Sequence, residues 1–157
     1  MRRPATAARL VLLLAALAGP AGAQGVTELQ VAAREAAGAR ETELYARRVT
    51  GVGPGPARVV WGASVTDRGA VWAGVGLGAT LGLGGGWSAG ASVMPGLRVE
   101  GGGADLGHPF QVRSSLAVSR ALGPGRLALG FDHLSNAGLD DRNPGSDAVF
   151  LRWSLVR

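Results

Sequence analysis

The chain has 157 residues, of which 27 are Gly, two are His and none is Cys. Glycine at about 17% argues against a helical bundle, and the absence of Cys excludes disulfides, thiolate metal sites and cysteine nucleophiles. With only two His, a His-based metal cluster is not expected, and we predict neither a metal nor an organic cofactor.

Residues 1–23 have the pattern of a secretory signal peptide. Three Arg accompany an apolar run over residues 10–17, and the small residues Ala21, Gly22 and Ala23 form a cleavage site. The run is shorter than the ~20 apolar residues that a spanning helix needs. These three Arg also account for most of the formal net charge of +5. Residues 24–157 carry a net charge of only +2, so no nucleic-acid partner is expected.

The rest of the chain alternates apolar and polar residues with the period of two that predicts β-strands. The alternation is blurred over 27–34 and 42–50, and clear over 57–66, 69–83 and 87–100. Between positions 69 and 83, one face carries only apolar side chains and the other is mostly glycine. The apolar set is Val71, Ala73, Val75, Leu77, Ala79, Leu81 and Leu83.

The alternation continues over 110–122, 126–135 and 147–156. Glycine-rich turn signals separate the segments, among them Gly84-Gly85-Gly86 and Asn143-Pro144-Gly145. In all we expect about eight strands.

Eight alternating strands fit either a soluble barrel with an apolar interior or an outer-membrane barrel with an apolar exterior. The face opposite the apolar stripe is rich in Gly and Ser, which suits the narrow interior of a small barrel. Moreover, 17% charged residues are few for a soluble exterior. We therefore predict an all-β, eight-stranded antiparallel outer-membrane β-barrel, formed by residues 24–157 as one domain. Trp61, Trp87 and Trp153 are then expected to face outward.

The alternation also assigns charged residues to the interior. Asp132 is expected to join a paired network inside the barrel, together with Arg58, Arg98, Glu100 and Arg113. His108, which precedes a proline after a glycine-rich loop, is expected in an exposed turn.

Near the end of the chain the outward stripe runs into His133 and Ser135, and Asp147 has the outward parity of the last strand. Residues two apart on a strand are ~6.6 Å apart, which allows an imidazole to reach a neighbouring hydroxyl. The three residues could therefore form a Ser-His-Asp triad across one hairpin. The alternative is that they mark the polar membrane interface and an ordinary loop.

The segment Phe131-Asp132-His133-Leu134-Ser135-Asn136-Ala137-Gly138, followed by Asn143-Pro144-Gly145-Ser146-Asp147, resembles the catalytic hairpin of PagL-type lipid A 3-O-deacylases. This resemblance covers residues 127–155. It implies an eight-stranded outer-membrane barrel whose active site opens toward lipid on the outer surface. It also implies an esterase that removes the 3-linked 3-hydroxyacyl chain of lipid A in lipopolysaccharide.

The resemblance further implies Ser135 as the nucleophile, His133 as general base and then acid, and Asp147 as the acid that orients it. Asn136, with the backbone N–H groups around Ala137 and Gly138, corresponds to the oxyanion-stabilising segment. The family's acid is usually Glu, so Asp147 is one methylene shorter.

The implied partners are lipopolysaccharide, through its lipid A, and outer-membrane lipid. The sequence leaves open whether the barrel is a monomer or a homodimer. A non-catalytic small outer-membrane barrel with a structural or adhesive role is the alternative from another functional class.

Overall fold

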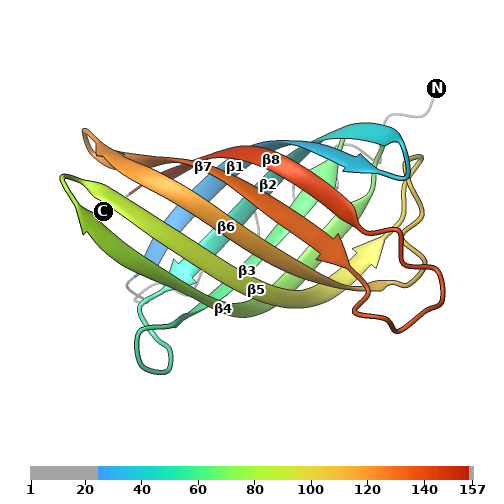
Figure 1. Ribbon diagram of the computed structural model, residues 1–157, viewed down its shortest axis with the longest axis horizontal. Helices are drawn as coiled ribbons and strands as arrows, with labels where there is room; N and C mark the ends of the chain where they lie inside the picture. The colour runs from blue at the N-terminus through green and yellow to red at the C-terminus, as the bar shows by residue number, and fades with distance from the viewer. Residues whose placement is uncertain (1–24, 156–157) are drawn as a thin grey trace.

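The structure is a computed structural model that describes residues 25–155, in which eight strands follow one another (Figure 1). The signal peptide expected at 1–23 lies outside the described residues. In the described part of the chain, no helix is long and apolar enough to cross a membrane. The strands are β1 (Gly25–Ala36), β2 (Ala39–Thr50), β3 (Arg58–Thr66), β4 (Val71–Gly84), β5 (Trp87–Val99), β6 (Phe110–Leu122), β7 (Gly125–Ser135) and β8 (Ser146–Leu155).

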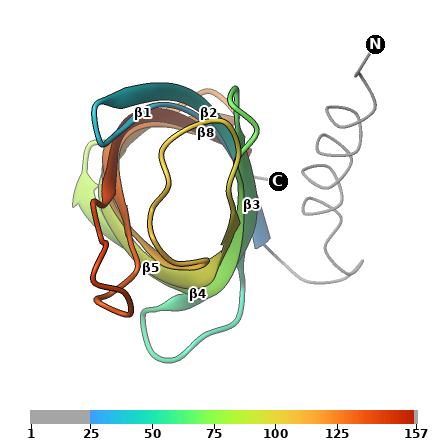
Figure 2. The same ribbon diagram turned by 90° about the vertical axis from the view of Figure 1, so that its right-hand side faces the viewer.

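The eight strands form a closed antiparallel barrel, seen end-on in Figure 2. Each strand pairs with its neighbours in the sequence, and β1 closes the ring against β8, from Thr27 opposite Leu155 to Glu35 opposite Asp147. Closure pairs the backbone of every strand on both sides and leaves no open sheet edge. The predicted eight-stranded antiparallel barrel is confirmed.

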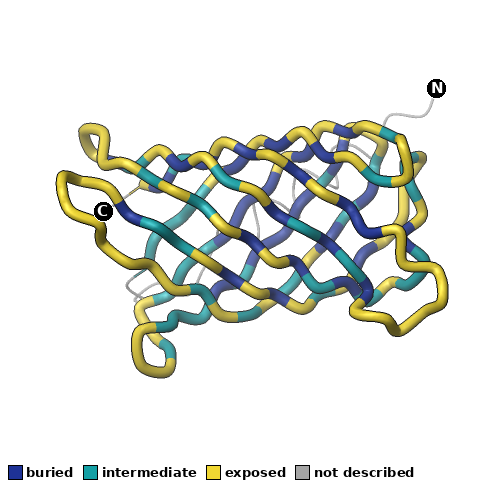
Figure 3. Tube along the Cα trace, in the orientation of Figure 1, coloured by how far each residue is buried: buried dark blue, intermediate teal, exposed yellow. Residues whose placement is uncertain are grey.

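Exposed and buried residues alternate along the strands (Figure 3). The apolar stripe predicted over 69–83 lies on the outside, where Leu77 is 43% and Leu81 68% exposed. Trp87 is also exposed, and Trp61 and Trp153 are half-buried on the same outer face. The barrel therefore has an apolar exterior, as predicted. Its other exposed large apolar residues include Leu29, Val31, Val93, Leu116, Leu129, Phe131, Val149 and Leu151.

The strands β1 and β2 are longer than the segments 27–34 and 42–50 predicted for them. Their alternation is blurred because charged residues occur on both faces. In β2, Glu43 and Arg47 are buried in the interior while Arg40 points out. A pattern based on apolar residues alone therefore underestimates the length of these two strands.

Two kinds of side chain fill the interior. A buried apolar cluster consists of Tyr45, Val60, Trp72, Met94, Leu106 and Leu134. Beside it lies a charged cluster in which Arg113, with no exposed surface, contacts Glu43 and Asp132 at 2.5 and 3.5 Å. Arg34 contacts the same two carboxylates.

The network expected around Asp132 is thus correct for Arg113 but wrong for three other members. Arg98 forms a separate pair with Glu100, at 3.1 Å, and Arg58 donates to the carbonyl groups of Gly55 and Ala57. Alternation identifies residues that point inward but not their height along the barrel, and this height decides which charges meet.

The two ends of the barrel differ. The connections after β1, β3, β5 and β7 gather at one end, which we call the long-loop end because it carries the 100–109 and 136–145 loops. We call the opposite end, which holds both described chain ends, the terminal end. The 100–109 loop crosses the barrel mouth at the long-loop end (Figure 2). His108 is half-buried in this loop, and its Nδ1 accepts a hydrogen bond from the backbone N–H of Phe110.

Candidate active site

The hairpin of β7 and β8 brings His133 and Asp147 together on the outer face. The two residues are direct cross-strand partners, and His133 Nδ1 lies 2.7 Å from Asp147 Oδ1. An ionised carboxylate can only accept a hydrogen bond, so Nδ1 carries a proton, which in the neutral imidazole leaves the lone pair on Nε2. This hydrogen bond therefore favours the tautomer in which Nε2 can act as a base.

Ser135 follows His133 on the same face of β7, at the last position of the strand, and is half-buried. No hydrogen bond joins the two side chains, although both residues lie within the described part of the chain. A strand spacing of ~6.6 Å between their Cα atoms leaves the hydroxyl within reach after side-chain rotation. The structure therefore brings His133 and Asp147 into contact and places Ser135 beside them.

A second serine, which the sequence did not reveal, lies near the imidazole. Ser114 on β6 lies directly opposite His133 in the β6–β7 register, and it is exposed. Side chains of directly opposed residues are ~5 Å apart at Cβ, so this hydroxyl is also close to the ring. Only the strand register, which the sequence does not give, reveals this neighbour.

The loop after Ser135 is organised around Asn136, which is completely buried. Its side-chain N–H groups donate to the carbonyls of Leu106 and Arg142, at 3.5 and 2.9 Å. Its side-chain oxygen accepts the backbone N–H of Gly138 at 3.0 Å, and its own backbone N–H donates to Asn143. Asn136 is therefore fully engaged in shaping the loop.

Ala137 differs from its two neighbours. Its φ of +57° is uncommon for a residue with a side chain, and such conformations concentrate at functional sites. Among the described residues, its backbone N–H has no hydrogen-bond partner. Of the expected oxyanion-stabilising residues Asn136, Ala137 and Gly138, only Ala137 keeps an unused backbone donor.

The 100–109 loop supports this arrangement from the barrel mouth. Leu106 is buried in the apolar cluster while its carbonyl accepts from Asn136, and Asp105 pairs with Arg142 at 2.8 Å. These contacts join residues of the two loops that are 30 and 37 positions apart in the sequence. No local sequence signal distinguishes Leu106, because its role depends on how the loop folds over the mouth.

Gly145, in the turn before β8, lies against the imidazole. Its φ is +67°, and a Cβ at this position would approach His133 Cε1 to 2.9 Å and Nε2 to 3.6 Å. A glycine therefore leaves the space that the ring occupies. The turn signal Asn143-Pro144-Gly145 was visible in the sequence, but the contact with His133 was not.

A groove runs beside Asp147 on the outer surface, between the β1–β2 turn and the β7–β8 hairpin. Its volume is about 460 Å³. Small and apolar residues make up most of its lining, so an apolar chain could lie along it. They include Ala33, Ala36, Ala37, Phe131, Pro144 and Val149.

The chain is similar to a known protein family. A family model described as lipid A 3-O-deacylase (PagL) matches residues 36–156. Among curated proteins, no sequence match to the chain is found.

Several solved structures share the fold. The crystal structure of the outer membrane enzyme PagL has a TM-score of 0.58 at 14% identity, over 83% of this chain and 98% of that chain. Neisserial surface protein A has a TM-score of 0.58 at 11% identity, over 87% and 99%. A de novo designed transmembrane β-barrel has a TM-score of 0.56 at 11% identity, over 83% and 96%. At these identities the likeness establishes the barrel fold.

Proposed function

Because the chain belongs to the lipid A 3-O-deacylase (PagL) family, and is therefore an outer-membrane barrel enzyme acting on lipid A, we propose that it removes the 3-O-linked 3-hydroxyacyl chain by a serine esterase mechanism. The observation that carries this proposal is the 2.7 Å contact between His133 Nδ1 and Asp147 Oδ1 on the outer face. It prepares Nε2 as a base beside Ser135, on the surface that meets lipid.

In the proposed acylation step, the Ser135 hydroxyl oxygen attacks the ester carbonyl carbon while His133 Nε2 takes the hydroxyl proton. The bond between the carbonyl carbon and the sugar oxygen then breaks, and His133 returns the proton to that oxygen. Asp147 keeps the imidazole in the required tautomer and stabilises its charged form.

Deacylation repeats the same chemistry with water. Water attacks the acyl-serine carbonyl and gives one proton to His133, which then protonates the departing Ser135 oxygen. The products are a free 3-hydroxy fatty acid and lipid A with a free 3-hydroxyl group. No redox step is involved.

In both steps the carbonyl oxygen becomes negatively charged and needs hydrogen-bond donors. The backbone N–H of Ala137 is our proposed donor, because it is unused and follows the nucleophile by two residues. Asn136 and Gly138 act indirectly, because the Gly138 N–H donates to the Asn136 side-chain oxygen and the Asn136 side-chain N–H donates to the Arg142 carbonyl, which holds the loop in place. The apolar groove beside Asp147 offers room for the acyl chain.

The experiment that tests the nucleophile compares Ser135→Ala with Ser114→Ala. Ser135→Ala should reduce fatty-acid release from purified lipopolysaccharide by at least ~10³-fold, measured by mass spectrometry, with the folded barrel intact. Ser114→Ala is the matched control, because this serine also faces His133, and it should retain nearly full activity.

Two outcomes would contradict the proposal. Loss of activity in Ser114→Ala together with an active Ser135→Ala would transfer the nucleophile to β6. If the parent protein itself released no fatty acid from lipopolysaccharide, a non-catalytic structural or adhesive barrel would explain this chain better.

A further inference from the structure

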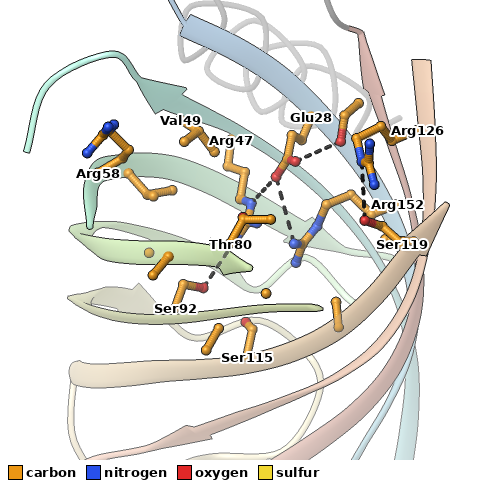
Figure 4. A pocket seen from close by; sticks show the side chains of 18 of the residues that line it. Glu28, Arg47, Val49, Arg58, Thr80, Ser92, Ser115, Ser119, Arg126 and Arg152 are labelled. Atoms are coloured by element: carbon orange, nitrogen blue, oxygen red, sulfur yellow. Dashed lines mark hydrogen bonds and ion pairs between the residues drawn. The ribbon is translucent and has the colours of Figure 1, made fainter. Parts of the chain in front are cut away.

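A second cavity lies inside the barrel, toward the terminal end (Figure 4). Its volume is about 300 Å³, and its lining does not include His133, Ser135 or Asp147. Pro56 and Arg58, next to the connection between β2 and β3, border it, so it lies toward the end opposite the long loops. It is therefore separate from the surface site.

The charges that line this cavity are unbalanced. Two buried arginines, Arg47 and Arg152, share a single acid, Glu28, which contacts them at 2.5 and 3.7 Å. This leaves one buried positive charge in excess. Arg58 and Arg126 also border the cavity, but they are half-buried and donate to carbonyl or serine oxygens.

The charged cluster in the other half of the interior is balanced. There Arg34 and Arg113 contact two carboxylates, Glu43 and Asp132. Buried charges are costly unless they are paired, and the unbalanced half lacks the acids that would pair its arginines. The excess positive charge therefore favours an anion from outside the chain.

Ser115 provides an independent indication of a ligand. It lines the cavity and is only 6% exposed, yet its hydroxyl has no hydrogen-bond partner in the structure. Figure 4 shows this hydroxyl among the cavity-lining side chains. A buried hydroxyl without a partner costs free energy, whereas an oxyanion would accept its hydrogen bond.

Arg47 lies beside Ser115 and has unused donor groups. Its Nε bonds Glu28 and its Nη1 bonds Ser92, the direct β5 partner of Ser115, while a guanidinium has five N–H groups in all. Guanidinium groups and a hydroxyl around one small space are the donors that a phosphate-sized oxyanion requires.

We propose that this cavity binds a phosphate group, held by the arginines around Glu28 and by the hydroxyl of Ser115. The group enters from the terminal end. It belongs either to inorganic phosphate or to the headgroup of a phospholipid at that end of the barrel, since both present the same oxygens. The bound phosphate completes the charge balance of the interior.

The test uses the purified full-length protein in a maltoside detergent, which contains no phosphate. Inorganic phosphate is titrated against sodium chloride at equal ionic strength, and the thermal unfolding midpoint is measured. We expect phosphate, but not chloride, to raise the midpoint in a saturable way.

Two variants and one matched control locate the effect. Arg47→Gln should weaken phosphate binding by about tenfold, the loss expected for one charge-assisted hydrogen bond. Ser115→Ala should weaken binding by several-fold while leaving the phosphate-free midpoint unchanged or higher, because it removes an unpaired buried hydroxyl. Arg120→Gln removes an equal charge nearby on the barrel exterior, where Arg120 lies against Trp87, and should bind phosphate like the parent.

A second arm replaces phosphate by mixed micelles that contain phosphatidylglycerol, with the same three variants. Stabilisation in this arm alone, lost in Ser115→Ala and Arg47→Gln, would assign the site to a lipid headgroup. Stabilisation by inorganic phosphate would assign it to the free anion. The proposal is overturned if neither arm stabilises the parent, or if Arg120→Gln loses the effect as fully as Arg47→Gln does.

Discussion

The imidazole of His133 has two neighbours that constrain it differently. Asp147 holds Nδ1 through a hydrogen bond, and Gly145 leaves open the space next to Cε1. Both side chains of the pair are well exposed, at 42% for His133 and 60% for Asp147, so solvent screens their attraction. The contact therefore matters for orientation and tautomer rather than for the stability of the barrel.

Substitution of Asp147 tests this orienting role. Asp147→Asn should preserve the folded barrel but reduce deacylation by up to ~10⁴-fold, because an amide can bind the wrong tautomer. Asp147→Glu should retain more activity than Asp147→Asn, because it keeps a carboxylate. Asp140→Asn and Asp141→Asn are the controls in the neighbouring loop and should retain nearly full deacylation activity. A fully active Asp147→Asn beside an inactive Asp140→Asn or Asp141→Asn would show that another carboxylate orients His133.

Substitution of Gly145 tests the space beside the ring. Gly145→Ala should reduce the rate of deacylation by about 10²-fold, because its Cβ would displace the imidazole from the serine. Gly123→Ala is the matched control, since Gly123, in the β6–β7 turn at the terminal end, also has a positive φ but nothing within 4 Å of the added Cβ. Equal losses of activity in the two variants would mean that backbone strain, not contact with His133, explains the effect.

Among the strands, β6 connects the interior to the site. Its Arg113 donates to Glu43 and Ser64, and its guanidinium lies 4.3 Å from the ring centre of Tyr45 and 4.6 Å from that of Trp72. One side chain thus links residues of β2, β3 and β4. Because β6 also pairs with β7, Arg113 helps to hold the strand that carries His133.

Arg113→Met should therefore destabilise the barrel by about 3–5 kcal/mol, because it leaves two buried carboxylates with less compensation. Urea unfolding in detergent micelles, followed by tryptophan fluorescence, measures this change. Arg40→Met is the control, because Arg40 pairs with Glu35 on the exposed surface, and its midpoint should hardly change. An unfolding free energy for Arg113→Met within 1 kcal/mol of the parent would contradict the assigned role.

The molecule as a whole is a barrel with an apolar outer surface, an interior that holds both apolar and charged clusters, and long loops at one end. Long loops of outer-membrane barrels lie on the extracellular side and short turns on the periplasmic side. The long-loop end, with His133, Asp147 and the 100–109 loop, therefore faces the medium, and the terminal end faces the periplasm. This orientation places the proposed catalytic site at the leaflet that contains lipopolysaccharide.

The apolar outer surface predicts that the cost of a charged substitution depends on its depth in the membrane. Leu77 lies midway along β4, and Leu83 lies near its end at the β4–β5 turn, with both side chains pointing outward. Leu77→Arg should cost about 2–4 kcal/mol of unfolding free energy in lipid vesicles, and Leu83→Arg about 0–1 kcal/mol. Urea titration in vesicles compares the two variants. Equal costs would argue against a membrane mid-plane at Leu77.

The sequence by itself determined the β class and the outward face of most strands, and it predicted His133, Ser135 and Asp147 as candidate site residues. It could do so because side chains alternate with a period of two along a strand, and because a short hairpin keeps His133, Ser135 and Asp147 close in the sequence. The parity of Asp147 identified it correctly as a residue of the outer face, and the register made it the direct partner of His133.

Only the tertiary structure decided which side chains are in contact, because this depends on the height of each residue along the barrel and on the strand register. It separated Arg58, Arg98 and Glu100 from Asp132, placed Ser114 opposite His133, and joined Asn136 to Leu106. It also divided the interior charges into one balanced cluster and one with excess arginine. Alternation identifies the face of a strand on which a residue lies. The closure of the barrel fixes the stagger between strands, and this stagger decides which side chains meet across the barrel.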